Sequence, residues 1–285
     1  MPWEWLWHGD QYANHFSGPD RAFRYFDGWA PYLANEPLWN FFAAATTPIA
    51  EQIGWRNWVR LISFFSLFVL AYFVLSRSPS RYWAIALLLI TSPLILNNYI
   101  SGVRQTLAIA VFLLALMSPR FLKIPIILVT PLIHSTFFIA LPFYFLALTD
   151  WVSFRAKVWI TAFVALSLLL LVPILSEELG ARQAERFDFG FDLTIRPLWI
   201  YLLFIVVVFF LSGPRFMREH QVAITGMMFY IFSAPLGGAD VAGRTIENFF
   251  PFMFIALSYL RGIAFYIIFA ATLPAIAFLW MRGIT

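Results

Sequence analysis

In the segment NNYISGVRQTLAIAVFLLALMS, residues 97–118, a polar run leads directly into an apolar one. Residues 97–104 are predicted to form a loop, and residues 105–118 carry no charged side chain and are predicted to span a membrane. Arg104 stands at the junction, and an arginine at the centre of a membrane helix costs roughly 2.5–3.5 kcal/mol to insert. Chains accept this cost mainly where the group faces a polar cavity, so Arg104 is a candidate for handling a charged substrate.

A second polar side chain, His134, interrupts the apolar run LIHSTF. The surrounding segment 122–149 is too long for one simple span and contains Pro125, Pro131 and Pro142. Proline is tolerated in membrane helices where the kink is lined by protein or by a cavity. Residues 122–149 are therefore predicted to form a broken helix pair whose break lies near His134.

The composition indicates a polytopic integral membrane protein. Of 285 residues, 61% are hydrophobic and 12% are charged, whereas soluble domains carry about 25% charged residues. Mean hydropathy is +0.78. We expect an all-α bundle of about 9–11 membrane segments, broken or re-entrant helices included. The absence of cysteine excludes disulfides and thiolate chemistry. The net charge of +4 comes from scattered Lys and Arg, so no nucleic-acid partner is expected.

The apolar segments divide the chain into spans within a single transmembrane domain, residues 1–285. Residues 1–35 are polar and aromatic and are predicted to lie at the outer face before the bundle. Residues 37–53 are predicted to be a broken, re-entrant or interfacial helix, because Thr46-Thr47-Pro48 interrupts them. The further predicted spans are 58–76, 82–96, 105–118, 157–175, 197–212, 221–237, 245–260 and 263–281.

The distribution of basic residues predicts the topology. Short loops rich in Lys and Arg lie on the cytoplasmic side, and the candidates are Arg77 with Arg81, Arg120 with Lys123, Arg155 with Lys157, and Arg215 with Arg218. With these inside, the outer face receives residues 1–36, 97–104, 176–196 and 237–247. His134, at the tip of its hairpin, points to the same side. One outward-opening cavity would then collect the polar residues that are costly to bury.

The side chains expected at such a cavity indicate which substrates it could bind. Arginine holds phosphate through bidentate, charge-assisted hydrogen bonds, which makes Arg104 and Arg244 candidate anion-binding residues with Gln105 as a neutral donor. Histidine and carboxylates transfer protons, so His134, Asp240 and Asp10 are the candidate bases. Structural explanations stay open: Arg104 in a structural pair, His134 as a neutral hydrogen-bonding group, and Asp240 with Arg244 as an ordinary i,i+4 ion pair. The four His show no metal-ligand spacing, so no metal site is expected.

Several segments, taken in order, resemble a known family. NEPLWNFF (residues 35–42), VRQTLA (103–108) and IHST (133–136) are similar to the "EP", "RQxxA" and "HxS/T" elements of EpsG-type, Wzy-like polysaccharide polymerases. The segment Asp10-Gln11-Tyr12 resembles the Asp/Tyr segment that precedes the EP element, and Arg244 with FFPF (249–252) resembles a late arginine helix more loosely. Members of that family usually begin with a transmembrane helix before the Asp/Tyr segment, and this sequence shows none there.

The resemblance implies a polymerase of undecaprenyl-pyrophosphate-linked oligosaccharides at the outer face of the cytoplasmic membrane. The growing glycan would leave its lipid diphosphate and join a sugar hydroxyl of the next unit. Arg104, Gln105 and Arg244 would bind the diphosphate, and Glu36 and Tyr12 would bind substrate. His134 would act as the base, with Asp240 or Asp10 as the fallback. No cofactor is expected.

The expected partners are the lipid-linked oligosaccharide and the bilayer, with a flippase and a chain-length regulator as candidates. Three other classes stay open: a lipid-linked glycan ligase or other membrane glycosyltransferase, a polysaccharide or lipid transporter, and an integral membrane acyltransferase.

Overall fold

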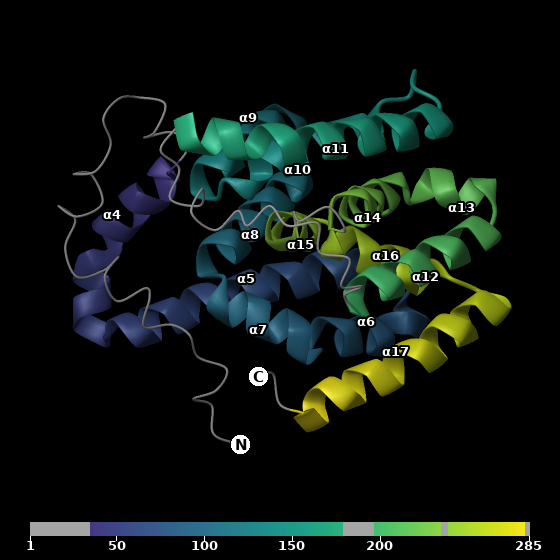
Figure 1. Ribbon diagram of the computed structural model, residues 1–285. Helices are drawn as coiled ribbons and strands as arrows, with labels where there is room; N and C mark the ends of the chain where they lie inside the picture. Colours follow the sequence, from purple (N-terminus) through teal and green to yellow (C-terminus); the bar gives the residue numbers. More distant parts are fainter. Residues whose placement is uncertain (1–34, 179–196, 235–238, 283–285) are drawn as a thin grey trace. The chain divides into compact units, whose positions relative to one another are not determined.

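A computed structural model describes residues 35–178, 197–234 and 239–282. In these ranges the regular structure is helical and no strand occurs, which confirms the all-α prediction (Figure 1). The chain divides into two compact units, residues 1–135 together with 271–285, and residues 136–270.

The first unit is built from helices joined by very short connections. They are α4 (Pro37–Ile53), α5 (Trp55–Arg77), the short 3-10 helix η3 (Ser80–Tyr82), α6 (Trp83–Ile90), α7 (Pro93–Ser101), α8 (Val103–Met117) and α9 (Arg120–Ile133). Proline begins α4 and α7, where its missing N–H removes a donor that a helix leaves unpaired anyway. Gly54, at φ 84°, turns the chain between α4 and α5 in a conformation that favours glycine.

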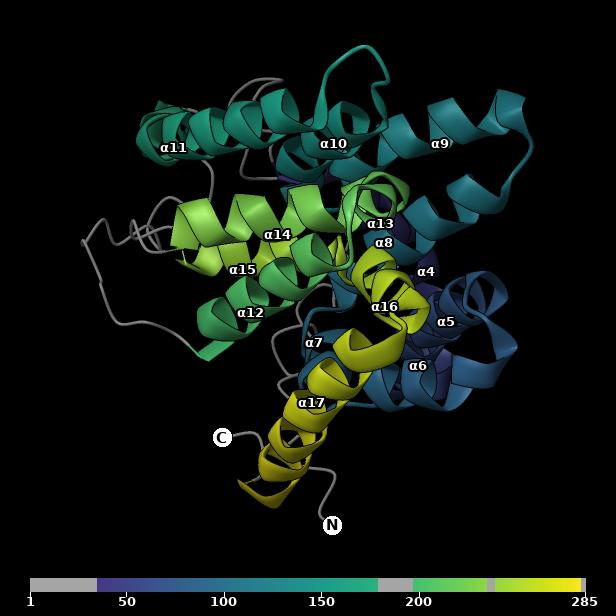
Figure 2. The same ribbon diagram turned by 90° about the vertical axis from the view of Figure 1, so that its right-hand side faces the viewer.

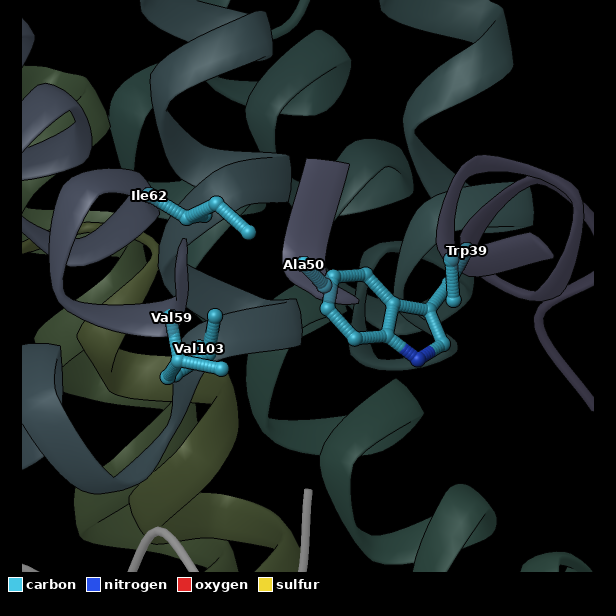
Figure 3. Packing of buried hydrophobic residues seen from close by; sticks show 6 residues of the cluster. Trp39, Ala50, Val59, Ile62 and Val103 are labelled. Atoms are coloured by element: carbon cyan, nitrogen blue, oxygen red, sulfur yellow. The ribbon is translucent and has the colours of Figure 1, made fainter. Parts of the chain in front are cut away.

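The core of the first unit lies between α4, α5 and α8. Trp39 and Ala50 from α4 pack with Val59 and Ile62 from α5 and with Val103, the first residue of α8 (Figure 3). All five are at most 5% exposed. This packing fixes the start of α8, and with it Arg104, beside the start of α4.

The connection between α7 and α8 is a single residue, Gly102. The amide of Gly102 donates to the carbonyl of Asn98 at 2.8 Å and ends α7. A Cβ at Gly102 would meet the same carbonyl oxygen at 2.8 Å, closer than side-chain carbons normally approach. The absence of a side chain therefore allows a single residue to connect α7 and α8.

Helix α5 is the one described helix that is long and apolar enough to cross a membrane by itself, with 23 residues. The pair Ser80–Ile90 and Ile95–Ser101 passes the same test only as one span bent by 57°. Helices α8, α10 (Thr136–Leu148), α14 (Gln221–Ser233) and α16 (Phe250–Tyr259) are apolar but shorter. On α5, one face is buried while the other exposes a row of large apolar side chains, Leu61, Phe64, Phe65, Phe68 and Tyr72.

The second unit surrounds α14 with neighbouring helices. Its elements are α10 (Thr136–Leu148), α11 (Phe154–Glu178), α12 (Pro197–Leu211), α13 (Pro214–Glu219), α14 (Gln221–Ser233), α15 (Ala239–Glu247), α16 (Phe250–Tyr259) and the first part of α17 (Gly262–Arg282). Helix α14 contacts α10, α11, α12, α15 and α16, and Figure 2 shows it between α11 and α12. Phe229 of α14 meets Phe143 of α10 with ring centroids 4.7 Å apart. Phe249 packs directly on Gly226 of α14.

Two predicted helices and one predicted break are confirmed by the structure. Helices α5 and α8 occupy the predicted segments 58–76 and 105–118, and α5 alone of the two has the length of a span. The number of membrane segments stays a prediction. The break predicted inside 122–149 occurs at His134 and Ser135, between α9 and α10. The inside–outside topology stays a prediction.

Other predictions were wrong. The break predicted within residues 37–53 is absent, because α4 is one continuous helix that accommodates Pro48. The hydroxyls of Thr46 and Thr47 bond back to the carbonyls of Phe42 and Ala43 at 2.8 and 2.9 Å. The re-entrant or interfacial placement of this helix stays a prediction. The predicted span 82–96 is divided between α6 and α7 at Thr91–Ser92, and α7 continues to Ser101 through most of the predicted loop 97–104.

The predicted span 245–260 was also wrong. It is divided at Asn248 and Phe249, and α15 occupies most of the predicted outer loop 237–247. At this break the Asn248 side chain donates to the Thr136 hydroxyl at 3.2 Å, and this bond secures the chain where helical bonding stops.

Candidate functional site

The site centres on the carboxylate of Glu36, which lies immediately before α4. Its backbone is left-handed, with φ 60° and ψ 58°, the one non-glycine residue with positive φ in the described ranges. This conformation costs roughly 1–2 kcal/mol and persists only where surrounding contacts enforce it. The following residue, Pro37, also disfavours the ordinary helical conformation at Glu36. The left-handed turn places a carboxylate that is 2% exposed inside the first unit.

Arg104, the second residue of α8, donates from Nη1 to Oε2 of Glu36. The two residues are 68 positions apart in the sequence. The Arg104 side chain is 32% exposed, whereas the Glu36 side chain is 3% exposed. The guanidinium therefore joins a buried anion to the surface of the unit.

The break between α9 and α10 supplies the other partners of Glu36. Helix α9 ends at Ile133, and the Ser135 amide, left without a helical acceptor, donates to Oε1 of Glu36 at 3.2 Å. The Ser135 hydroxyl lies 3.3 Å from the same oxygen and donates to it. His134 Nε2 lies 3.7 Å from Oε1, and the imidazole is 2% exposed. The broken helix thus turns two consecutive residues toward one carboxylate.

The surroundings of Glu36 favour its ionised form. Burial by itself raises the pKa of a carboxyl, but the charge of Arg104, the His134 ring in its protonated form and the two hydrogen bonds from Ser135 lower it further than burial raises it. The net result is a pKa below the ordinary value of 4.5. Glu36 is therefore a fixed negative charge at neutral pH, which binds Arg104 and lies 3.7 Å from His134 Nε2.

The structure brings together three of the predicted site residues: Glu36, Arg104 and His134. Gln105 follows Arg104 on α8 and is buried, at 3% exposed. Ser135 is a site residue that the sequence reasoning missed. Its signal was its place beside His134 at a predicted helix break, where backbone donors lose their helical partners.

Four other predicted site residues lie in the second unit or outside the described residues. Asp240 and Arg244 lie on α15, which belongs to the second unit. Arg244 is exposed, and its charge acts on Glu247 one turn further along α15. Asp10 and Tyr12 lie outside the described residues, and so does the side chain of Asp240.

The arrangement is suited to binding an anion and to proton transfer. A partly exposed guanidinium that is bonded to a buried carboxylate is preorganised to bind phosphate oxygens. An imidazole beside the same carboxylate resembles the base-and-orienting-acid arrangement of general acid–base sites. Among the residues that the structure describes, no three His, Asp or Glu side chains gather closely enough to hold a metal ion. No protein-family model, no curated protein and no solved structure matches this chain.

Proposed function

We propose that this chain is a multi-pass protein of the cytoplasmic membrane that polymerises oligosaccharide units linked to undecaprenyl pyrophosphate. One observation carries the proposal: the EP, RQ and HS segments, which lie far apart in the sequence, converge on the Glu36 carboxylate. Arg104 Nη1 is bonded to Oε2, and His134 and Ser135 face Oε1. Segments chosen for their resemblance to a family therefore meet in one cluster.

The exposed apolar surface supports the membrane location. Helix α5 has the length and composition of a span. Its exposed residues at positions 61, 64, 65, 68 and 72 recur at helical spacing, so they form one apolar face. Phe64 is 69% exposed and Phe68 is 61% exposed. A contiguous apolar face of this kind is what lipid contact requires and what a water-exposed surface avoids.

In this proposal Arg104 binds the diphosphate of the donor. The guanidinium remains charged at any physiological pH and presents a planar set of donors to phosphate oxygens. Glu36 positions that guanidinium, and Ser135 holds Glu36. As the glycan leaves, negative charge grows on the bridging diphosphate oxygen, and a fixed cation stabilises that charge in the transition state.

His134 then acts on the acceptor. The acceptor sugar hydroxyl gives its proton to the imidazole while its oxygen bonds to the anomeric carbon of the growing glycan. The bond from that carbon to the diphosphate oxygen breaks, and its electron pair leaves with the lipid diphosphate. Because His134 is 2% exposed, it receives the proton only from a hydroxyl that has entered beside Arg104. The same burial keeps water from competing as the acceptor.

The test uses the full-length protein in liposomes, with lipid-linked repeat units added at the face that carries residues 35–36. Glycan length is read on gels, and released undecaprenyl pyrophosphate is measured in parallel. The wild type is expected to give a ladder of polymers. Arg104→Met is expected to give only single units, and Arg104→Lys to lose most activity because it keeps the charge without the planar fork. Arg120→Met, which replaces an exposed arginine at the start of α9, is the matched control for loss of one arginine.

The other outcomes identify rival functions. Transfer of a single unit to a different acceptor would indicate a ligase, and movement of the lipid across the bilayer without glycan joining would indicate a transporter. Transfer of an acyl group with unchanged glycan length would indicate an acyltransferase. Polymer formation by Arg104→Met at the wild-type rate would refute the role given to Arg104.

A further inference from the structure

Four exposed arginines lie at the helix junctions of one end of the second unit. Arg155 is near the start of α11, Arg215 and Arg218 are on α13, and Arg261 is between α16 and α17. We call this group, together with the junctions that carry it, the basic end. The four residues lie in three stretches of sequence, so contacts between the junctions decide whether they act as one surface.

Lys157 connects the first two junctions. Its Nζ is buried and donates to the Ala147 carbonyl, in the last turn of α10, at 2.6 Å. It also donates to Oε1 of Gln221, the first residue of α14, at 2.7 Å. One lysine therefore holds the α10–α11 turn against the α13–α14 junction.

His220 connects the α13–α14 junction to the α16–α17 junction. Its ring lies 4.5 Å from the ring of Phe216 and 5.3 Å from the ring of Tyr259, measured between centroids. Arg215 bonds to Glu219 at 2.9 Å, and Arg261 is close enough for its charge to act on the same Glu219. The arginines of all three junctions thus belong to one end of the unit.

Charge and exposure at this end point to one kind of partner. Against the four arginines and Lys157 stand the acids Asp150 and Glu219, so the basic end carries net positive charge. Apolar side chains project beside the arginines: Trp151 is 89% exposed, Leu211 80% and Ile263 79%. Projecting apolar groups next to exposed arginines are typical of a membrane interface, where the first meet the acyl chains and the second meet the headgroups.

We propose that the basic end binds the phosphate headgroups of anionic phospholipids in the leaflet that it faces. Arginine binds a phosphate through two parallel hydrogen bonds, and several arginines on one surface act together on a negatively charged leaflet. The inference rests on the membrane location proposed above and is independent of the glycan chemistry.

The experiment uses the absence of cysteine in the chain. Ser212→Cys places a single labelling site on the α12–α13 connection. This site lies two residues before the start of α13, the helix that carries Arg215 and Arg218. The full-length protein carrying a fluorophore at this position is reconstituted in phosphatidylcholine vesicles. Brominated phosphatidylglycerol or brominated phosphatidylcholine is then added as the quencher over a range of mole fractions.

Preferential quenching by the anionic lipid is the expected result. One arginine near a charged leaflet favours binding about fivefold, so phosphatidylglycerol should quench at roughly a fifth or less of the mole fraction that phosphatidylcholine needs. High salt should reduce this ratio, and Arg215→Gln/Arg218→Gln/Arg261→Gln should bring it to about one. Arg77→Gln/Arg81→Gln, in the other unit, should leave it unchanged.

The remaining outcomes contradict the proposal in distinguishable ways. Equal quenching by the two lipids in the wild type would overturn the anionic preference while leaving the membrane location in place. Quenching by neither lipid would show that the surface does not face a membrane. Loss of the preference in millimolar inorganic phosphate would assign the arginines to a soluble anion. None of these results depends on polymerase activity.

Discussion

The bond between Glu36 and Arg104 is expected to couple the two residues energetically in unfolding. Two unit charges about 4 Å apart attract by about 4 kcal/mol at an effective dielectric constant near 20. Desolvation of the buried Glu36 carboxylate offsets part of this attraction, whereas Arg104, 32% exposed, keeps part of its hydration. Charge-assisted hydrogen bonds of this kind contribute about 1.5–3 kcal/mol net, and that is the coupling energy we expect.

A double-mutant cycle measures this coupling. Glu36→Gln removes the charge with little change in shape, and Arg104→Met removes the guanidinium but keeps a long side chain. Each single substitution leaves one charge without its counter-charge, so each should destabilise the unit. The double variant should be less destabilised than the sum of the two by the coupling energy.

The assay is equilibrium unfolding of the full-length protein in mixed micelles by increasing dodecyl sulfate, followed by tryptophan fluorescence. Arg215→Gln with Glu219→Gln is the control cycle, because that pair is exposed and should show no measurable coupling. Additivity of Glu36→Gln and Arg104→Met within about 0.5 kcal/mol would refute the assignment of this bond as the centre of the site.

Three further perturbations, one change of pH and two substitutions, should each lower the stability of the folded protein. Folding lowers the pKa of Glu36, so the ionised carboxylate stabilises the fold at pH values above its unfolded pKa of 4.5. This stabilisation is lost as the pH falls through the folded pKa. Below pH 4.5 the melting temperature should therefore fall more for the wild type than for Glu36→Gln. Lys157→Met should destabilise the protein by about 1–3 kcal/mol in the unfolding assay, because it leaves the buried Ala147 carbonyl without this donor. Gly226→Ala places a Cβ 2.2 Å from Cγ of Phe249 and should lower the melting temperature by overpacking. Phe249→Leu in the same chain should restore part of the loss, and no recovery would contradict that contact.

Composition and apolar runs were sufficient to predict helices. A chain in which 61% of residues are hydrophobic and 12% are charged offers its backbone few polar partners outside itself, and helices satisfy backbone hydrogen bonds within one segment. Helix α5, whose apolar run holds no proline, was predicted within about three residues. Proline and polar residues were less reliable guides, because helix α4 continues through Thr46, Thr47 and Pro48, whereas α6 ends at Thr91–Ser92, before Pro93.

Arg104 and His134 could be named from the sequence alone, because a charged or polar group in an apolar chain is costly enough to mark its position, and Glu36 could be named through the EP element. That these residues meet follows only from the tertiary structure, because Arg104 and Glu36 are 68 positions apart and Ser135, next to His134, bonds to Glu36 across 99 positions. The tertiary structure also puts Glu36 at the centre of the cluster, adds Ser135, and leaves Arg104 partly exposed while His134 is buried. Local pattern cannot give these facts, because they depend on the packing of α4, α8 and α9 and on a left-handed turn that only those contacts hold in place.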